Sequence, residues 1–221
     1  SGKSTLIKAI CGDLPYTGKI GINGVDVASA PAWKLAALRG VLPQSTALAF
    51  PFTAIEVVRI GLTSGTGASE ANRAEAALAR VGLAHHAQSF YQELSGGEQQ
   101  RVQLARVLAQ VWHPRVNGVP HWLMLDEPVS SLDIAQQLEV MRLAREFAAG
   151  GGGVIAVMHD LNLTGLFADK VVVMAGGAVL AAGPVMDVMN DEVLSKAYGC
   201  ALQVNSVPQD GHPFILPHAA G

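Results

Sequence analysis

A serine and two glycines directly before a helical pattern constrain the fold of this chain more than any other stretch. The residues are Leu94-Ser95-Gly96-Gly97-Glu98-Gln99-Gln100-Arg101. Glycine costs about 1 kcal/mol relative to alanine inside a helix, so the glycine pair predicts a helix end. Apolar residues then recur close to every 3.6 positions through residues 98–110. We therefore predict a helix start with Ser95 near the N-cap, where bare N–H groups of Gly96 and Gly97 suit an anion.

The chain opens on the last part of a phosphate-binding pattern. Ser1-Gly2-Lys3-Ser4 matches the end of G-x-x-x-x-G-K-[ST], and an apolar helical pattern follows it. In this pattern backbone N–H groups cradle the phosphate oxygens and a lysine reaches the β- and γ-phosphates. The Ser4 hydroxyl is then a ligand for Mg²⁺. The sequence thus predicts a phosphate site at the start of the first helix.

A short apolar run further along the chain ends in two acidic residues. Residues 122–125 (WLML) read as a buried parallel strand, and Asp126 and Glu127 follow it. Ligands of open α/β sheets collect at the carboxyl ends of the strands. Asp126 there can hold Mg²⁺ through water, and Glu127 can orient or deprotonate a water in line with a γ-phosphate. A carboxylate at position 127 thus favours hydrolysis of a bound phosphate compound over binding alone.

With these three stretches in this order, the chain resembles the ATP-binding subunits of ABC transporters, and residues 94–101 resemble their signature motif. The resemblance implies an α/β fold: a P-loop NTPase (RecA-like) core with a small antiparallel β part and an inserted α-helical subdomain. It implies that residues 1–46 and 113–221 form the core and residues 47–112 the helical subdomain. It further implies roughly three dozen residues before Ser1, with a strand that feeds the phosphate loop and an aromatic that stacks on adenine.

Three more positions match motifs of this family. Gln44 follows the apolar residues 41–42 and matches the Q-loop, whose amide reaches Mg²⁺ and the attacking water. Ser131-Leu132-Asp133 matches the D-loop, which lies across the dimer interface. His159 follows a second apolar run and matches the switch histidine that hydrogen-bonds the γ-phosphate.

The resemblance assigns a role to each of these residues in binding or hydrolysing ATP with Mg²⁺. The expected catalytic residues are Glu127, His159 and Gln44. The expected Mg²⁺ ligands are Ser4, Gln44 and Asp126. Two copies of the chain would hold two ATP molecules head to tail, and the expected ATP contacts are Gly2, Lys3, Ser4, Thr5, Ser95, Gly96, Gly97, Glu98 and Asp133.

Charge and hydropathy limit the partners. The formal net charge is −3 and no basic run is present, so a nucleic-acid footprint is absent. Residues 171–186 are too broken by glycine and proline to span a bilayer. The resemblance implies a homodimer on the cytoplasmic face of the inner membrane, bound to two transmembrane permease subunits and serving a periplasmic substrate-binding protein indirectly. The apolar residues 48–53 fit either a core or a contact with the permease.

Whole segments narrow the transported substrate. AFPFT and ARVLAQVW most resemble the ATPases of haem importers within the haem, ferric-siderophore and cobalamin branch. We therefore expect a subunit that drives hemin uptake, with a ferric-siderophore or cobalamin importer as the alternative. A non-transport relative acting on DNA or ribosomes fits less well, because the interval of about ninety residues between the first two motifs has no heptads.

Other residues carry structural expectations. The helix-like spacing of Trp33 with Leu35 predicts that Trp33 is packed. Residues 187–198 read as one helix, and the glycines of residues 63–69 as a flexible loop. Histidines in turn-rich stretches, without acidic or cysteine companions, are expected to face solvent. They are His85, His86, His113, His121, His212 and His218.

Overall fold

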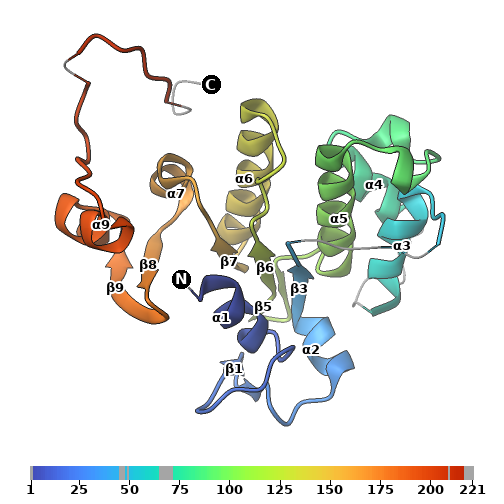
Figure 1. The fold of residues 1–221 in the computed structure, drawn as a ribbon. Helices are drawn as coiled ribbons and strands as arrows, with labels where there is room; N and C mark the ends of the chain where they lie inside the picture. The colour runs from blue at the N-terminus through green and yellow to red at the C-terminus, as the bar shows by residue number, and fades with distance from the viewer. Residues whose placement is uncertain (1, 45–47, 49, 65–71, 209, 217–221) are drawn as a thin grey trace. The chain divides into compact units, whose positions relative to one another are not determined.

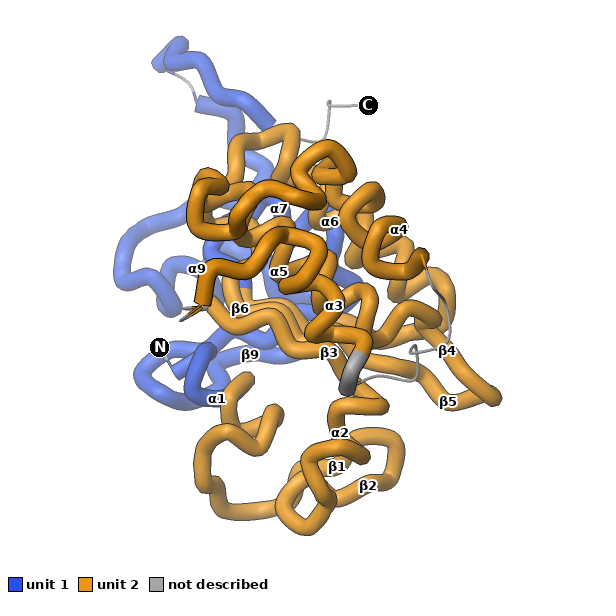
Figure 2. The backbone as a smooth tube through the Cα atoms, turned by 90° about the vertical axis from the view of Figure 1, so that its right-hand side faces the viewer, with its two compact units in different colours: residues 1–6, 158–221 blue, residues 7–157 orange. Residues whose placement is uncertain are grey.

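The computed structural model describes residues 2–44, 48, 50–64, 72–208 and 210–216 of the chain (Figure 1). Ser1, His218 and residues 65–69 of the expected flexible loop lie outside these described residues. The chain divides into two compact units (Figure 2). Unit 1 comprises Ser1–Leu6 and Met158–Gly221, and unit 2 comprises Ile7–Val157.

A parallel sheet with the strand order β3-β6-β7 lies at the centre of unit 2. The strands are β3 (Arg39–Leu42), β6 (Trp122–Asp126) and β7 (Gly153–Val157). The middle strand β6 is buried from its second residue onward, which explains its unbroken apolar run. Parallel pairing brings the carboxyl ends to one edge, with Leu42 beside Leu125 and Asp126 beside Val157. The expected buried strand with acidic residues at its end is confirmed.

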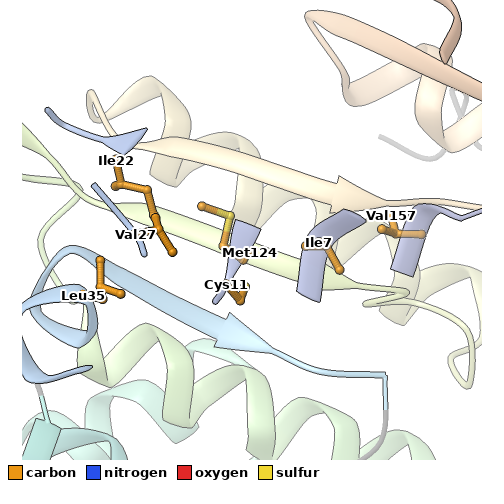
Figure 3. Packing of buried hydrophobic residues seen from close by; sticks show 7 residues of the cluster. All are labelled: Ile7, Cys11, Ile22, Val27, Leu35, Met124 and Val157. Carbon is orange, nitrogen blue, oxygen red and sulfur yellow. The ribbon is translucent and has the colours of Figure 1, made fainter. Parts of the chain in front are cut away.

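One face of this sheet packs against the core cluster of unit 2. The cluster consists of Ile7, Cys11, Ile22, Val27, Leu35, Met124 and Val157 (Figure 3). These residues come from β6, β7, α1 (Lys3–Ile10), α2 (Ala32–Leu38) and the segment around the antiparallel strands β1 (Gly21–Ile22) and β2 (Val25–Asp26). Asn23 and Gly24 connect β1 and β2 with φ of 51° and 78°, as a tight hairpin turn requires.

Three helices of unit 2 pack against one another beside β3. They are α3 (Ala54–Ser64), α4 (Arg73–Arg80) and α5 (Gly96–Gln110). Gly61 of α3 lies so close to α5 that a Cβ there would collide with the Arg106 carbonyl group. Gly40 of β3 makes a similarly close contact with Val107 of α5. Glycine thus allows backbone to approach backbone on both sides of α5.

Short elements lie between α4 and β6. They are the 3₁₀ turns η1 (Ala84–His86) and η2 (Tyr91–Glu93) before α5, and the hairpin strands β4 (Arg115–Val116) and β5 (Val119–Pro120) after it. A helix of 16 residues, α6 (Ile134–Ala149), connects β6 and β7.

Two expectations about side chains in unit 2 are wrong. Trp33 is 73% exposed. Helix α2 buries Leu35, and side chains two positions apart in a helix point to nearly opposite faces, so Trp33 points away from the core. His121 is only 3% exposed and does not face solvent. Its backbone extends the sheet, since it accepts a hydrogen bond from the Gly153 N–H at 2.8 Å, and burial lowers the pKa of its imidazole.

Besides the first turn of α1, the described residues of unit 1 form a hairpin and short helices. These elements are α7 (Leu161–Phe167), β8 (Lys170–Ala175), β9 (Ala178–Pro184), α8 (Val185–Val188) and α9 (Asp191–Tyr198). The helical structure expected over residues 187–198 is confirmed except at residues 189 and 190, where α8 ends and the Asn190 side chain accepts a hydrogen bond from the Val193 N–H at 3.0 Å and starts α9. No helix of the described residues is long and apolar enough to cross a membrane.

Candidate nucleotide site

The carboxyl edge of the unit 2 sheet presents two acidic residues. Asp126 ends β6 and is 3% exposed, while Glu127 is half-buried beside it. A carboxylate is costly to bury unless hydrogen bonds or a cation compensate its charge. Carboxylate oxygens are ligands that Mg²⁺ accepts, directly or through water. The residues present at this edge therefore fit a magnesium ion.

Glu127 has an unusual backbone conformation. Its φ is 54°, in the left-handed region that costs a residue with a side chain about 1–2 kcal/mol. Hydrogen bonds hold it there: its N–H donates to the Val157 carbonyl at 3.2 Å, and its own carbonyl accepts from Gln100 Nε2 at 2.8 Å. Ser130 Oγ donates to the same carbonyl at 3.3 Å. The surroundings therefore fix the direction in which the Glu127 side chain leaves the backbone.

The helix start predicted at Ser95 is confirmed. Ser95 is the N-cap of α5 and forms a capping box with Glu98. The Ser95 N–H and Oγ donate to Glu98 Oε2 at 2.8 Å and 2.7 Å, and the Glu98 N–H lies 3.4 Å from Ser95 Oγ. These hydrogen bonds from Ser95 lower the pKa of the Glu98 carboxyl. The box uses the side chains of Ser95 and Glu98 and leaves Ser95 and Gly96 exposed at the helix end.

The two glycines of this helix end differ. A Cβ on Gly96 would have no heavy atom within 4 Å, so this position is open. A Cβ on Gly97 would lie 3.1 Å from the Ser131 carbonyl oxygen and 3.1 Å from Leu132 Cδ2. Gly96 therefore presents its backbone to the outside, where an anion could bind. Gly97 instead allows α5 to approach the loop that follows Glu127.

A histidine supports the capping box. His86 Nε2 lies 3.3 Å from Glu98 Oε1, and its Nδ1 lies 3.1 Å from Ser89 Oγ. The ring also packs on His85 with 4.2 Å between the centroids. The expectation that His86 faces solvent is wrong, since its side chain is 29% exposed and paired with an acidic residue. Because this acidic companion comes from another turn of the chain, the local sequence around His86 did not reveal it.

The loop between Glu127 and α6 is held from both sides. Gln137 Nε2 of α6 donates to the Val129 and Leu132 carbonyls at 3.3 Å and 3.1 Å. Asp133 is the N-cap of α6, and its Oδ1 accepts from the Gln136 N–H at 2.9 Å. Asp133 is exposed, so its carboxylate can face a second molecule while it caps this helix.

Gln44 follows β3 at the same sheet edge as Asp126. It is exposed, and β3 ends at Leu42, whose register partner is Leu125 of β6. The next residues, 45–47, lie outside the described part of the chain. The strand end itself is fixed from α5, since Arg106 Nη2 donates to the Val41 carbonyl at 3.2 Å.

Unit 1 carries the remaining candidate residues. Gly2, with φ of 92°, precedes α1, and its carbonyl accepts from the Leu6 N–H at 2.9 Å. Lys3 and Ser4 are half-buried in the first turn of α1, and Thr5 is exposed. The N–H groups of this turn and the Lys3 ammonium suit phosphate oxygens, and the Ser4 hydroxyl suits Mg²⁺.

His159 lies in the same unit, directly before a helix. It is exposed and precedes Asp160, the N-cap of α7, whose Oδ1 accepts from the Leu163 N–H at 2.9 Å. The cap fixes the chain direction at the start of α7, directly after the His159 imidazole.

The sequence was compared with models of protein families and with the sequences of individual proteins. A family model described as "ABC transporter" matches residues 1–130. The hemin import ATP-binding protein of Roseobacter denitrificans is 60% identical over 220 residues, covering 100% of this chain and 84% of the relative. The protein of the same name from Rhizobium johnstonii is 56% identical over 223 residues, with 100% and 84% covered.

Solved structures agree in fold. A dimeric ATP-binding cassette in a post-hydrolysis state with ADP and Pi has a TM-score of 0.71 and 26% identity. The match covers 83% of this chain and 81% of that one. The structure of an ATP-binding subunit of an ABC transporter also has a TM-score of 0.71 and 26% identity, with 90% and 78% covered.

Proposed function

The chain belongs to the ABC transporter family, and from this premise we propose that it is the ATP-hydrolysing subunit of a hemin importer. The observation that carries the proposal is the sheet edge of Asp126 and Glu127 together with the open helix end at Gly96 in the same unit. Relatives named for hemin import, 51–60% identical over the length of this chain, support the substrate.

The residues divide the work of ATP hydrolysis. Lys3 and the N–H groups of the first α1 turn bind the β- and γ-phosphates, and Ser4 and Asp126 hold Mg²⁺. Bound Mg²⁺ supplies positive charge that neutralises the phosphate oxygens. Glu127 orients the attacking water and accepts its proton. Gln44 and His159 contribute an amide and an imidazole to the water and the γ-phosphate.

The open helix end acts on a second copy of the chain. Each copy holds one ATP with its own Lys3 and Glu127, and the partner covers it with Ser95, Gly96 and Gly97. Glu98 keeps that helix end capped, and Asp133 lies at the interface. The solved cassette that is dimeric with ADP and Pi supports this arrangement. The partial positive charge of such a helix end attracts the negative charge of the γ-phosphate. This attraction between the two chains is lost when phosphate is released.

We assign the docking of the membrane partner to residues 47–112. These residues form the helical subdomain, and residues 1–46 and 113–221 form the core. Phe50 is 67% exposed and Ile60 of α3 is 41% exposed, and apolar side chains of this size at a surface favour a protein partner. Two transmembrane permease subunits bind there, at the cytoplasmic face of the inner membrane, and a periplasmic substrate-binding protein acts through them.

Transport assays with the assembled importer test this function. The full chain, its permease and its binding protein are placed in liposomes, and ATP turnover is measured with hemin, a ferric siderophore or cobalamin. Hemin should stimulate turnover and be taken up with ATP. Stimulation by a ferric siderophore or cobalamin instead would overturn the substrate but not the ATPase. ATP turnover that no membrane partner alters would overturn the transport role.

A further inference from the structure

Gln100 links two parts of unit 2 that are far apart in sequence. It lies in the second turn of α5, and its Nε2 donates to the Glu127 carbonyl at 2.8 Å across 27 residues. Its Oε1 is buried and has no hydrogen-bond partner among the described residues. An amide that serves stability alone would pair at both ends, because an unpaired buried oxygen destabilises the fold. The contact to Glu127 is the one that Gln100 does make.

That contact holds a strained residue. Glu127 stands at φ 54°, and its carbonyl accepts hydrogen bonds from Gln100 Nε2 at 2.8 Å and from Ser130 Oγ at 3.3 Å. Without Gln100, rotation of the peptide group toward a relaxed conformation would meet less resistance. The same rotation would redirect the Glu127 carboxylate. Placement of that carboxylate therefore depends on a side chain of α5.

The start of α5 is fixed against the same loop. Gly97 packs on the Ser131 carbonyl and Leu132, and one helical turn later Gln100 reaches Glu127. The helix end and the loop that follows Glu127 thus meet at two points, one steric and one through a hydrogen bond. A displacement of either part changes the other.

We infer that Gln100 is a positioning residue that fixes the Glu127 backbone and thereby ties the two ATP sites of the dimer together. The inference rests on the proposed function. In that dimer Glu127 acts on the ATP of its own chain, whereas Ser95 to Gly97 of the same chain act on the ATP of the partner. The Gln100 hydrogen bond joins these two groups within one chain.

Gln100→Leu tests the positioning role. Leucine has a similar size, removes the donor to Glu127 and removes the unpaired oxygen, so the melting temperature should stay close to that of the wild type. We expect kcat to fall by roughly 10- to 100-fold, since small misplacements of catalytic groups have effects of this size. ATP affinity should change little. Gln99→Leu is the matched control, because Gln99 Nε2 donates to the Leu94 carbonyl at 2.9 Å on the same helix and does not contact Glu127.

Equal kcat in the two variants would overturn the positioning role, and so would a loss of kcat that merely follows a loss of folded protein. Gln100→Glu provides a second variant with the same shape and no donor when ionised, and should also lose turnover. If the wild type hydrolyses no ATP, or Glu127→Gln hydrolyses it normally, the proposed function fails instead of this inference.

A mixed dimer tests the link between sites. One chain is wild type, and its partner carries Glu127→Gln, so that only the site of the wild-type chain hydrolyses ATP. Adding Gln100→Leu to the partner leaves Glu127 of the wild-type chain unchanged. It disturbs only the partner's helix end, which covers the ATP bound by the wild-type chain. We expect single-turnover hydrolysis to slow by about fivefold or more, the lower range of typical coupling between sites. An unchanged rate would overturn the link and leave Gln100 with a role in its own chain alone.

Discussion

The helix end at Ser95 and the sheet edge at Glu127 are held in different ways. Ser95 is fixed by Glu98, three residues away, through a capping box that any short peptide with this pattern can form. Glu127 is fixed by Val157, Gln100 and Ser130, two of which are distant in the chain. The helix end is therefore a local structure, while the geometry of Glu127 requires the folded sheet and α5. Substitutions that destabilise the sheet or α5 should therefore change the backbone conformation of Glu127 more readily than that of the Ser95 cap.

The largest expected effect separates chemistry from structure at the sheet edge. Glu127→Gln keeps the size of the side chain and the hydrogen bonds of the backbone at this position, and it removes the carboxylate that we propose as the proton acceptor. ATP turnover should fall by about 10²–10⁴-fold, the usual contribution of a general base. ATP binding and the melting temperature should stay near the wild type. Phosphate release and nucleotide titration measure the two quantities, and unchanged turnover would remove Glu127 from its role.

The two glycines of the helix end should respond differently to an added methyl group. Gly96→Ala places a methyl group in open space and should raise the free energy of unfolding by up to about 1 kcal/mol, because alanine favours helices. Gly97→Ala puts the methyl group 3.1 Å from the Ser131 carbonyl oxygen and should lose this gain or destabilise the fold. Urea unfolding of both variants measures the difference. Equal stabilisation would show that α5 and the loop do not press on each other.

The capping box should lose its contribution in acid. Because hydrogen bonds from Ser95 lower the pKa of Glu98 below its ordinary 4.5, the stabilisation is complete above that pH and disappears as the pH falls through the lowered pKa. Glu98→Ala should cost about 1 kcal/mol at neutral pH and progressively less in acid. Denaturation across this pH range measures the cost, and a cost that does not shrink in acid would contradict the box.

A related cap at the start of α3, in the same unit, offers a control. On α3 the Thr53 N–H and Oγ1 each donate to Glu56 Oε2 at 2.8 Å, and they lower the pKa of Glu56 in the same way. Glu56→Ala should show the same dependence on pH without changing ATP turnover of the isolated chain. Under the proposed function, Glu98→Ala should reduce turnover as well, because its box lies at the helix end that we assign to ATP.

The smallest effect concerns the histidine beside the box. The His86–Glu98 pair should contribute about 0.2–1 kcal/mol when the imidazole is protonated, as partly exposed ion pairs do. A double-mutant cycle with His86→Ala and Glu98→Ala measures the coupling between the two side chains. A coupling of zero would show that this contact does not stabilise the fold.

Local patterns were sufficient to predict part of this structure. The N-cap at Ser95 and the apolar strand before Asp126 each depend on a few neighbouring residues, and the structure confirms them. The family and its α/β fold followed from the order of three such stretches. The catalytic and binding roles of individual residues stay predictions, since they concern ATP, Mg²⁺ and a second copy.

Features set by distant contacts could not be predicted in this way. The exposure of Trp33 depends on which face of α2 meets the sheet, and the burial of His121 depends on its pairing next to β7. The positive φ of Glu127 and its contact with Gln100 leave no trace in the spacing of residues. Each of these errors or omissions arises where the tertiary structure decides and local preference does not.

The glycine contact between α3 and α5 has a mechanical consequence. At Gly61 the two helices touch through their backbones, and on the other side of α5 the backbone of β3 at Gly40 touches Val107. A displacement of α3 by a binding partner would be transmitted to α5 and β3 with little loss, because few side-chain atoms separate the backbones at these contacts. The stiffness of the path from α3 through α5 to β3 would then depend on the absence of a Cβ at Gly61 and at Gly40.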